Sequence, residues 1–347
     1  MTEPSALSII LSIVNDQHPP SLMHCLSSDR ELYNSVLKLA RKNGLYYYSI
    51  NKLIENGIRI SPQENIAWEI ENKRLSEFKG SLRLLQELSS VHNIDSVIIK
   101  ACNTIPHVPR DIDFFVRAEE RKSVIDLLKE HGMKVVHDSI TETSLLNGSI
   151  KVDIYTQICY MGMDFFDCDF LLNSSTKEGM FNIEYKSLNA NASFLLMLVH
   201  SLFGHRCMTL LDFLHIGNII DKIDLAYCEK YADSNGWKGV LDLMLDNLSN
   251  LQRDILSENK ITNFPYLYDR TFVLQCVSAL QDYRLDRFNK FLLNCTLTQD
   301  RLIYELIDTP IYNFIKSNEN LRNGVNSFTS LSKSMRGDKK SANIKKL

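Results

Sequence analysis

A block of short β-branched runs between residues 94 and 160, enclosed by helical patterns on both sides, constrains the fold more than any other feature. Runs over 94–100 and 111–117 predict two strands, and residues 118–132 predict a helix. A further strand follows, and then a hairpin that turns at Asn147-Gly148. We therefore expect an α+β fold: a small mixed sheet with flanking helices, preceded and followed by helical regions.

The segment Ser61-Pro62-Gln63-Glu64 predicts the start of a long helix, because Ser61 and Glu64 can form a capping box with proline at the first helical position. Its apolar residues share helical spacing and predict one buried stripe: Ile66, Ile70, Phe78, Leu82, Leu85 and Leu88. The expected organisation is a helical region over 1–74, a core over 75–189, a helical domain over 190–316 and a flexible basic tail over 317–347.

Composition narrows the class of protein. Glycine is scarce, at 13 of 347 residues, so few breaks are expected in a helix-rich chain. A net charge of −3 provides no overall electrostatic field for attracting nucleic acid or an anionic membrane. The last fifteen residues carry a net charge of +5, and this tail could hold RNA loosely or remain solvated. The eight cysteines are scattered and form no CxxC pair, which favours a cytoplasmic protein. No apolar stretch approaches the roughly 20 residues that span a bilayer, so we expect no membrane segment.

Three aspartates form the main candidate site. Side chains alternate along a strand, so Asp111 and Asp113 project to one face while Ile112 projects to the other. Asp153 interrupts another apolar strand, and all three carboxylates converge if that strand lies beside the first. Such a group suits Mg²⁺ or Mn²⁺ and phosphoryl chemistry. The alternative is that the Asp-x-Asp pair is only solvated or caps a turn.

The same residues resemble a known family. An apolar strand ends at Lys100, a loop leads to Arg110 and Asp-Ile-Asp, and a lone strand aspartate follows about forty residues later. This order of features resembles that of the nucleotidyltransferase superfamily of the DNA polymerase β type. More narrowly, the pattern is similar to uncharacterised bacterial and archaeal nucleotidyltransferases with a leucine-lysine-glycine loop, which are related to toxin-type nucleotidyltransferases. The segment 194–216 resembles their helical half, with matching residues His200, His205, Arg206 and Asp212.

The resemblance implies roles for individual residues. Asp111 and Asp113 would bind the metal, and Asp153 would complete the site and help to deprotonate an acceptor hydroxyl. Lys100 and Arg110 would contact phosphate, which also follows from the need to stabilise triphosphate charge. The family's glycine is replaced by Ala101-Cys102-Asn103, so triphosphate binding needs substitutes, for which the candidates are Ser96, Asn103 and Thr104.

The histidines predict a polar seam and no metal pair. His200 and His205 are five residues apart and would not share an α-helical face. We expect a polar seam where the helical half meets the sheet, formed by His205, Arg206, Asp212 and His215. The more specific alternative is that His205 and Arg206 contact the nucleotide.

The leading hypothesis is therefore a metal-dependent nucleotidyltransferase that transfers NMP from an NTP to an acceptor hydroxyl. RNA or tRNA, protein and small molecules all remain open as acceptors. The alternative is a catalytically inactive binding or scaffold protein with the same fold, motivated by the missing glycine loop. The sequence makes no prediction of oligomeric state.

Overall fold

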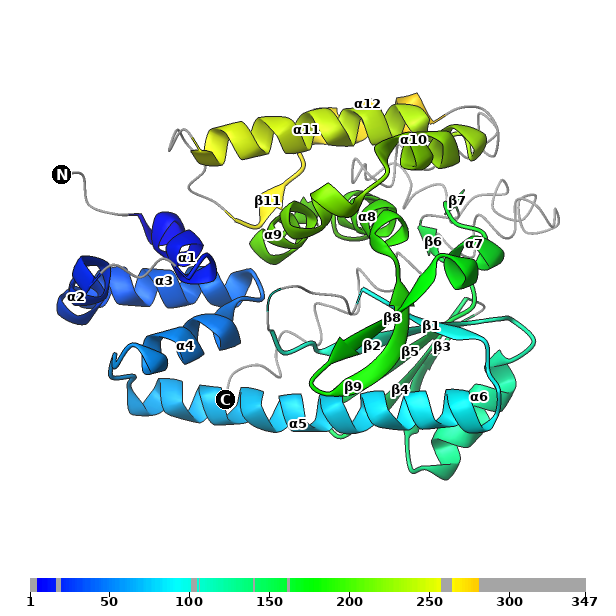
Figure 1. Ribbon diagram of the computed structural model, residues 1–347, viewed down its shortest axis with the longest axis horizontal. Helices are drawn as coiled ribbons and strands as arrows, with labels where there is room; N and C mark the ends of the chain where they lie inside the picture. The colour runs from blue at the N-terminus through cyan, green and yellow to red at the C-terminus, as the bar shows by residue number, and fades with distance from the viewer. Residues whose placement is uncertain are drawn as a thin grey trace, which may run out of the picture.

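The computed structural model describes residues 5–16, 20–100, 105, 107–139, 141–160, 163–256 and 264–280. Helices α1–α4 lie at one end of the molecule, and a mixed sheet lies between α5 and the later helices (Figure 1). The expected tail over 317–347 and residues 101–104 lie outside the described residues.

The N-terminal region is helical, with α1 Ala6–Val14, α2 Pro20–Ser28, α3 Arg30–Lys42 and α4 Tyr46–Glu55. The side chain of Asp29 caps α3 by accepting the N–H of Glu31 and of Leu32, both at 2.9 Å. Gly44 and Gly57 end α3 and α4 at φ +73° and +76°, a backbone conformation that glycine adopts without strain.

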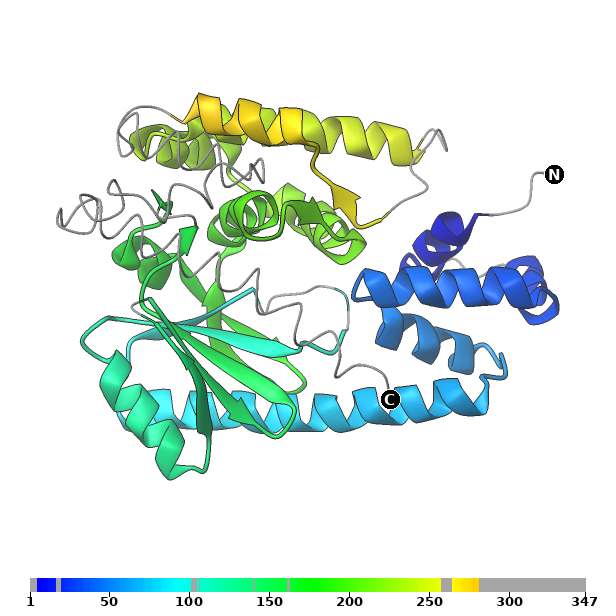
Figure 2. The same cartoon turned by 180° about the vertical axis from the view of Figure 1, so that it is seen from behind.

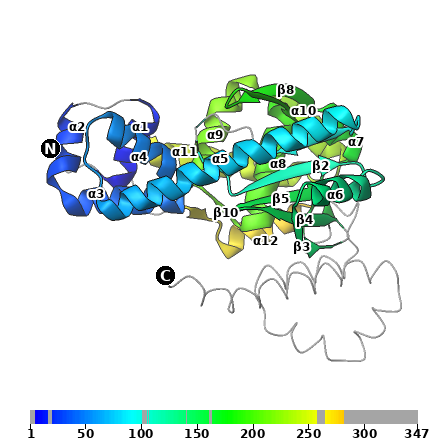
Figure 3. The same cartoon turned by 90° about the horizontal axis from the view of Figure 1, so that it is seen from below.

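Helix α5, Pro62–Val91, underlies both the N-terminal helices and the sheet (Figure 3). The predicted capping box is confirmed: the Glu64 N–H donates to Ser61 Oγ at 3.3 Å, and the Ser61 N–H donates to Glu64 Oε2 at 2.8 Å. The predicted apolar stripe is buried from Phe78 onward, as expected, but the prediction is wrong for the residues before Phe78. Ile66 and Ile70 are 59% and 53% exposed.

The first half of α5 instead turns a different face toward α4. Trp68 Nε1 donates to Asn51 Oδ1 of α4 at 2.9 Å. The helix has two packing partners along its length, and its buried face shifts between them, which a single stripe does not predict.

The sheet has seven strands in the order β3-β4-β5-β2-β1-β9-β8. Their bounds are β1 Ser96–Ile99, β2 Asp111–Val116, β3 Lys134–Asp138, β4 Glu142–Asn147, β5 Ile150–Tyr155, β8 Ser175–Met180 and β9 Ile183–Leu188. The pairs β2–β5 and β1–β9 are parallel and the others are antiparallel. The α+β expectation is confirmed, although the β8–β9 hairpin was not predicted.

The two faces of the sheet differ in cover. One face packs its apolar side chains, including Ile112 and Val152, against α5 and α6, Arg121–Glu130. On the other face, Val97, Ile99 and Phe115 join a core shared with the N-terminal and later helices. We call this second face, which carries Asp113 and Asp153, the site face.

The remaining helices lie on the site-face side, as seen from both directions (Figures 1 and 2). They are α7 Cys168–Asn173, α8 Ala190–Val199, the π-helix η1 His200–His205, α9 Leu210–Ile219, the 3₁₀ turn η2 Ile220–Lys222, α10 Leu225–Ser234, α11 Lys238–Leu256 and α12 Arg270–Ala279. Two small pairs join them: β6 Cys159–Tyr160 with β7 Met163–Asp164, and β10 Cys207–Met208 with β11 Tyr266–Leu267. Among the described helices, none has the length and apolar character that crossing a bilayer requires.

Candidate active site

Asp113 and Asp153 are neighbours on the site face. They are direct partners in the register of the parallel strands β2 and β5, so both side chains project to the same side. Asp113 is 7% exposed and Asp153 is 1% exposed. Two carboxylates held this close and this deep repel each other unless cations compensate their charge.

Lys100 supplies one of these cations. It follows β1 directly, and its Nζ lies 2.6 Å from Asp113 Oδ2. Burial alone would lower the pKa of Lys100, but the charge and hydrogen bond of Asp113, with Tyr160 and Asp111, together outweigh it and the pKa is raised. The backbone of Lys100 has φ 63°, a left-handed conformation that costs a non-glycine residue about 1–2 kcal/mol. The chain thus turns sharply where the lysine meets the acid.

Lys151 supplies the second cation. Its Nζ lies 2.6 Å from Asp153 Oδ2, on the same strand and face. The other oxygen, Asp153 Oδ1, is buried and has no hydrogen-bond partner in the described part of the chain. Since buried polar atoms are nearly always paired, this oxygen is open to a water molecule or an ion.

Asp111 lies two residues before Asp113, on the same face and at the exposed start of β2. Partial desolvation by the surrounding protein raises its pKa, and the Asp113 carboxylate adds to this shift, while Lys100 opposes it. Arg110 precedes it and is exposed, and its carbonyl accepts the Lys151 N–H at 3.3 Å. Both residues are therefore open to a ligand that approaches the carboxylates.

The histidine pair departs from the expectation. His200 and His205 form the ends of the π-helix η1, and their ring centroids lie 4.3 Å apart. A π-helix bonds residues five apart, so it brings together two side chains that an α-helix would separate. The prediction that they do not share a face is wrong for this reason.

A close fit holds this pair. The Tyr160 hydroxyl and His200 Nδ1 form a hydrogen bond of 2.8 Å, and a Cβ on Gly204 would lie only 2.8 Å from that same nitrogen. Burial, followed by the positive charge of Lys100, lowers the pKa of both His200 and His205. The two rings are therefore favoured in their neutral form beside the site.

The polar seam expected around Arg206, Asp212 and His215 has structural contacts. Asp212 completes a capping box at the start of α9, with its Oδ2 accepting the Thr209 N–H at 3.1 Å. The Arg206 carbonyl accepts the N–H of Tyr268 at 3.1 Å. Burial lowers the pKa of His215 to about 4.

Of the other predicted residues, Ser96 does not join this group. Ser96 lies at the far end of β1, where its hydroxyl bonds that of Ser89 at 3.0 Å. Asn103 and Thr104 lie outside the described residues.

Sequence reasoning missed two neighbours of Asp153 on β4. Ser144 is its direct partner in the antiparallel register, and Glu142 pairs with Tyr155 on the same face. The alternation in Glu142–Asn147, read across the Asn147-Gly148 turn, could have placed both residues on the site face. The site face therefore carries a fourth carboxylate.

The acids fit a divalent ion only in part. Within the described ranges, no group of three or more His, Cys, Asp or Glu side chains is arranged to hold a metal by itself. Mg²⁺, however, commonly takes one or two carboxylates and completes its shell with substrate phosphates and water. The facing pair Asp113 and Asp153, with the orphan oxygen of Asp153, fits a metal that arrives together with a nucleotide.

No protein-family model and no curated protein matches the chain. Among solved structures, it is similar to the lincosamide antibiotic adenylyltransferase LnuA in its lincomycin-bound form, with 16% identity and a TM-score of 0.30, over 40% of this chain and 94% of that one. It is also similar to the antibiotic-resistance factor ANT(2'')-Ia, with 10% identity and a TM-score of 0.35, over 52% of this chain and 98% of that one. Both TM-scores are low, so the function has to be argued from the geometry of the site.

Proposed function

We propose that the protein is a metal-dependent nucleotidyltransferase that transfers NMP from an NTP to an acceptor hydroxyl. The observation that carries this proposal is the pairing of Asp113 with Asp153 on one buried face, with Lys100 2.6 Å from Asp113 Oδ2. The motif resemblance assigns the same residues to metal and phosphate. Two facing carboxylates beside a lysine suit a metal–triphosphate complex, because Mg²⁺ takes one or two carboxylates and the lysine can stabilise phosphate charge.

The residues have separable roles in this reaction. Asp111, Asp113 and Asp153 would hold Mg²⁺ or Mn²⁺, which supplies charge neutralisation at the α-phosphate. Lys100 and Arg110 would bind the phosphates, and neutral His205 with Arg206 would contact the nucleotide. The bond between the acceptor oxygen and the α-phosphorus forms as the bond to the β-phosphate oxygen breaks. Pyrophosphate leaves, and Asp153 helps to take the hydroxyl proton.

A transfer assay tests this proposal. The protein is incubated with each α-labelled NTP, Mg²⁺ or Mn²⁺, and separated RNA, protein and small-molecule fractions of a lysate. We expect label in one fraction with wild type and none with Asp113→Asn. Asp138→Asn is the matched control, because Asp138 is an exposed strand aspartate in a 2.8 Å ion pair with Arg121. Transfer that survives Asp113→Asn would refute the assignment.

One observation favours a second candidate, a non-catalytic binding protein. Lys100 and Lys151 each engage one oxygen of the paired carboxylates, so the charges of Asp113 and Asp153 themselves are balanced without a metal. That candidate predicts no thermal shift with any NTP and Mg²⁺, whereas the enzyme predicts a nucleotide-specific rise in Tm.

A further inference from the structure

Lys151 shares one face of the sheet with carboxylates from three strands. Asp153 Oδ2 of β5 is 2.6 Å from its Nζ, and Asp111 of β2 is its direct partner in the parallel register. Glu142 of β4 shares the same face. The ammonium group of Lys151 thus lies beside the acids of the site.

Metal sites of phosphoryl-transfer enzymes often use such a meeting point for a second ion, about 3.5–4 Å from the first. We propose that Lys151 is a built-in cation that takes the place of a second metal, so that the site binds one divalent ion together with the nucleotide. This inference rests on the proposed nucleotidyl transfer and specifies its metal requirement.

The local charges leave negative charge for an ion to balance. The carboxylates of Asp111, Asp113 and Asp153 outnumber the two ammonium groups of Lys100 and Lys151 on this face. The unpartnered Asp153 Oδ1 leaves one oxygen of that carboxylate for this ion while Lys151 keeps the other. Lys151 is a positioning residue in this scheme, since it acts through Asp153.

Counting bound Mn²⁺ tests the inference without measuring activity. Free Mn²⁺ is followed by its EPR signal while the protein is titrated in the presence of the α,β-methylene analogues of ATP, CTP, GTP and UTP. We expect wild type to bind one Mn²⁺ per chain with the accepted analogue. Lys151→Met should bind a second Mn²⁺ at least about tenfold tighter than wild type, because a positive charge next to Asp153 has been removed.

Two variants keep the result interpretable. Lys151→Arg retains the charge and should still bind one Mn²⁺, and Lys177→Met removes an exposed strand lysine paired to Glu184 at 2.8 Å and should change nothing. If Lys151→Met is too unstable to titrate, Lys151→Gln replaces it, because glutamine keeps a hydrogen-bond donor for Asp153 Oδ2 and removes only the charge. Lys151→Gln should show the same gain in Mn²⁺ affinity.

The contradicting results are distinct. Two Mn²⁺ per wild-type chain would overturn the built-in cation and leave the proposed nucleotidyl transfer intact. Weaker analogue binding by Lys151→Met, with unchanged Mn²⁺ stoichiometry, would do the same and would make Lys151 a phosphate ligand. Absence of any Mn²⁺–analogue binding by wild type would overturn the proposed function and this inference together.

Discussion

Glu64 in the N-terminal region and Asp153 on the site face are both buried carboxylates, 8% and 1% exposed, but their partners differ. Glu64 Oε2 accepts the Ser61 N–H at 2.8 Å and the Tyr33 hydroxyl at 2.9 Å, and Arg30 lies 3.9 Å away. Asp153 has one lysine on Oδ2 and nothing on Oδ1 among the described residues.

Under the proposed function, the difference separates an acid used for folding from an acid held for a ligand. The partners of Glu64 come from its own helix cap and from α3, so the hydrogen bonds tie two elements together. Asp153 lies in the middle of a strand that its apolar neighbours already hold in place, and its charge adds little to that packing. Substitutions should therefore affect stability at one site and activity at the other.

The largest effect should follow Asp153→Asn. The substitution keeps the shape but removes the negative charge and the proton acceptor, so we expect nucleotidyl transfer to fall by about 10³-fold or more. The free energy of unfolding should change by less than about 1 kcal/mol, because Lys151, the partner left behind, is 41% exposed and is solvated by water. Label transfer and urea unfolding measure the two quantities. A loss of stability that matches the loss of activity would contradict the comparison.

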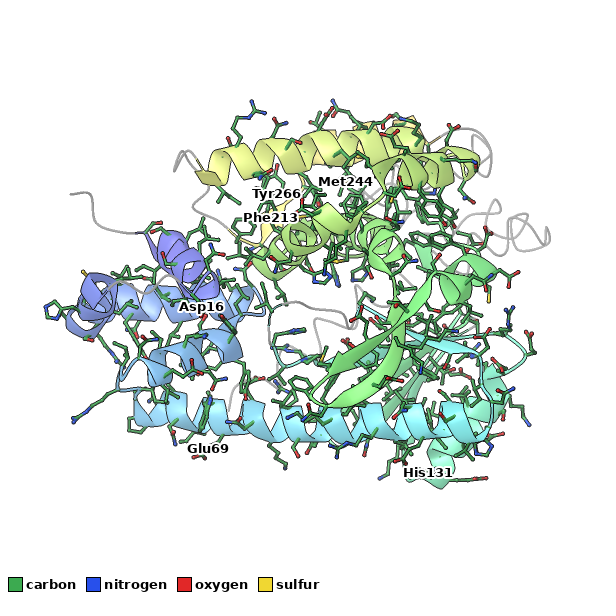
Figure 4. All side chains as sticks on the ribbon, viewed as in Figure 1. Asp16, Glu69, His131, Phe213, Met244 and Tyr266 are labelled. Carbon is green, nitrogen blue, oxygen red and sulfur yellow. The ribbon has the colours of Figure 1, made fainter. Side chains whose placement is uncertain are left out.

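Glu64→Gln should show the reverse. Losing charge-assisted hydrogen bonds inside a helix cap should lower the free energy of unfolding by about 2 kcal/mol, with transfer per folded molecule unchanged. Glu69→Gln is the matched control on the same helix: Glu69 is exposed, and it projects away from the protein below α5 in Figure 4. Equal unfolding midpoints for these two variants would count against a structural role for Glu64.

The effect of Glu64 should also depend on pH. Burial alone would raise the pKa of Glu64, but hydrogen bonds from Ser61 and Tyr33 outweigh it and lower the pKa in the folded state. The stabilisation is therefore present above the unfolded pKa of about 4.3 and is lost as pH falls through the lower folded value. Urea midpoints of wild type and Glu64→Gln should differ at pH 7 and converge below about pH 4. A gap that persists in acid would show that shape, and not charge, is responsible.

Gly204→Ala should have an intermediate effect on the site alone. The added Cβ would approach His200 Nδ1 at 2.8 Å and Tyr160 Cε1 at 3.3 Å, so the π turn must shift. We expect kcat/KM to fall by about tenfold, because His205 moves with that turn. Gly217→Ala is the control, since nothing lies within 4 Å of its added Cβ. Unchanged kinetics would separate the histidine pair from the reaction.

The smallest effect should be that of Asp111→Asn on stability. Desolvation and the Asp113 carboxylate raise the pKa of Asp111, so its ionised form opposes folding at neutral pH. Tm should rise by roughly 1–2 °C at pH 7, and the gain should vanish in acid, where the wild-type carboxyl is protonated. Scanning calorimetry at both pH values tests this, and a lower Tm at pH 7 would indicate that Asp111 supports the fold.

Sequence patterns predicted the fold where local rules decide it. The alternation in β2 and β5 predicted which way Asp113 and Asp153 project, and the parallel pairing of the two strands, which the sequence left as a condition, brings them together. The β8–β9 hairpin escaped because its turn uses Phe181 and Asn182 at φ 54° and 62°, where glycine is the usual signal.

The rest of the site depends on geometry that patterns do not encode. The contact between His200 and His205 requires a π turn, which the α-helical spacing of the surrounding apolar residues does not reveal. The orphan oxygen of Asp153 is a property of packing and not of residue order. The exposure of Ile66 reflects a change of packing partner along α5, which only the tertiary structure shows.

Anomalous diffraction from crystals grown with Mn²⁺ and an α,β-methylene nucleotide tests most directly whether the facing carboxylates seat a metal–nucleotide complex. We predict a peak within coordinating distance of Asp113 and of Asp153 Oδ1, with the phosphates of the analogue completing its shell and the Lys151–Asp153 pair kept. No peak there, with both lysine–aspartate pairs unchanged and the analogue absent or bound elsewhere, would contradict the proposed enzyme.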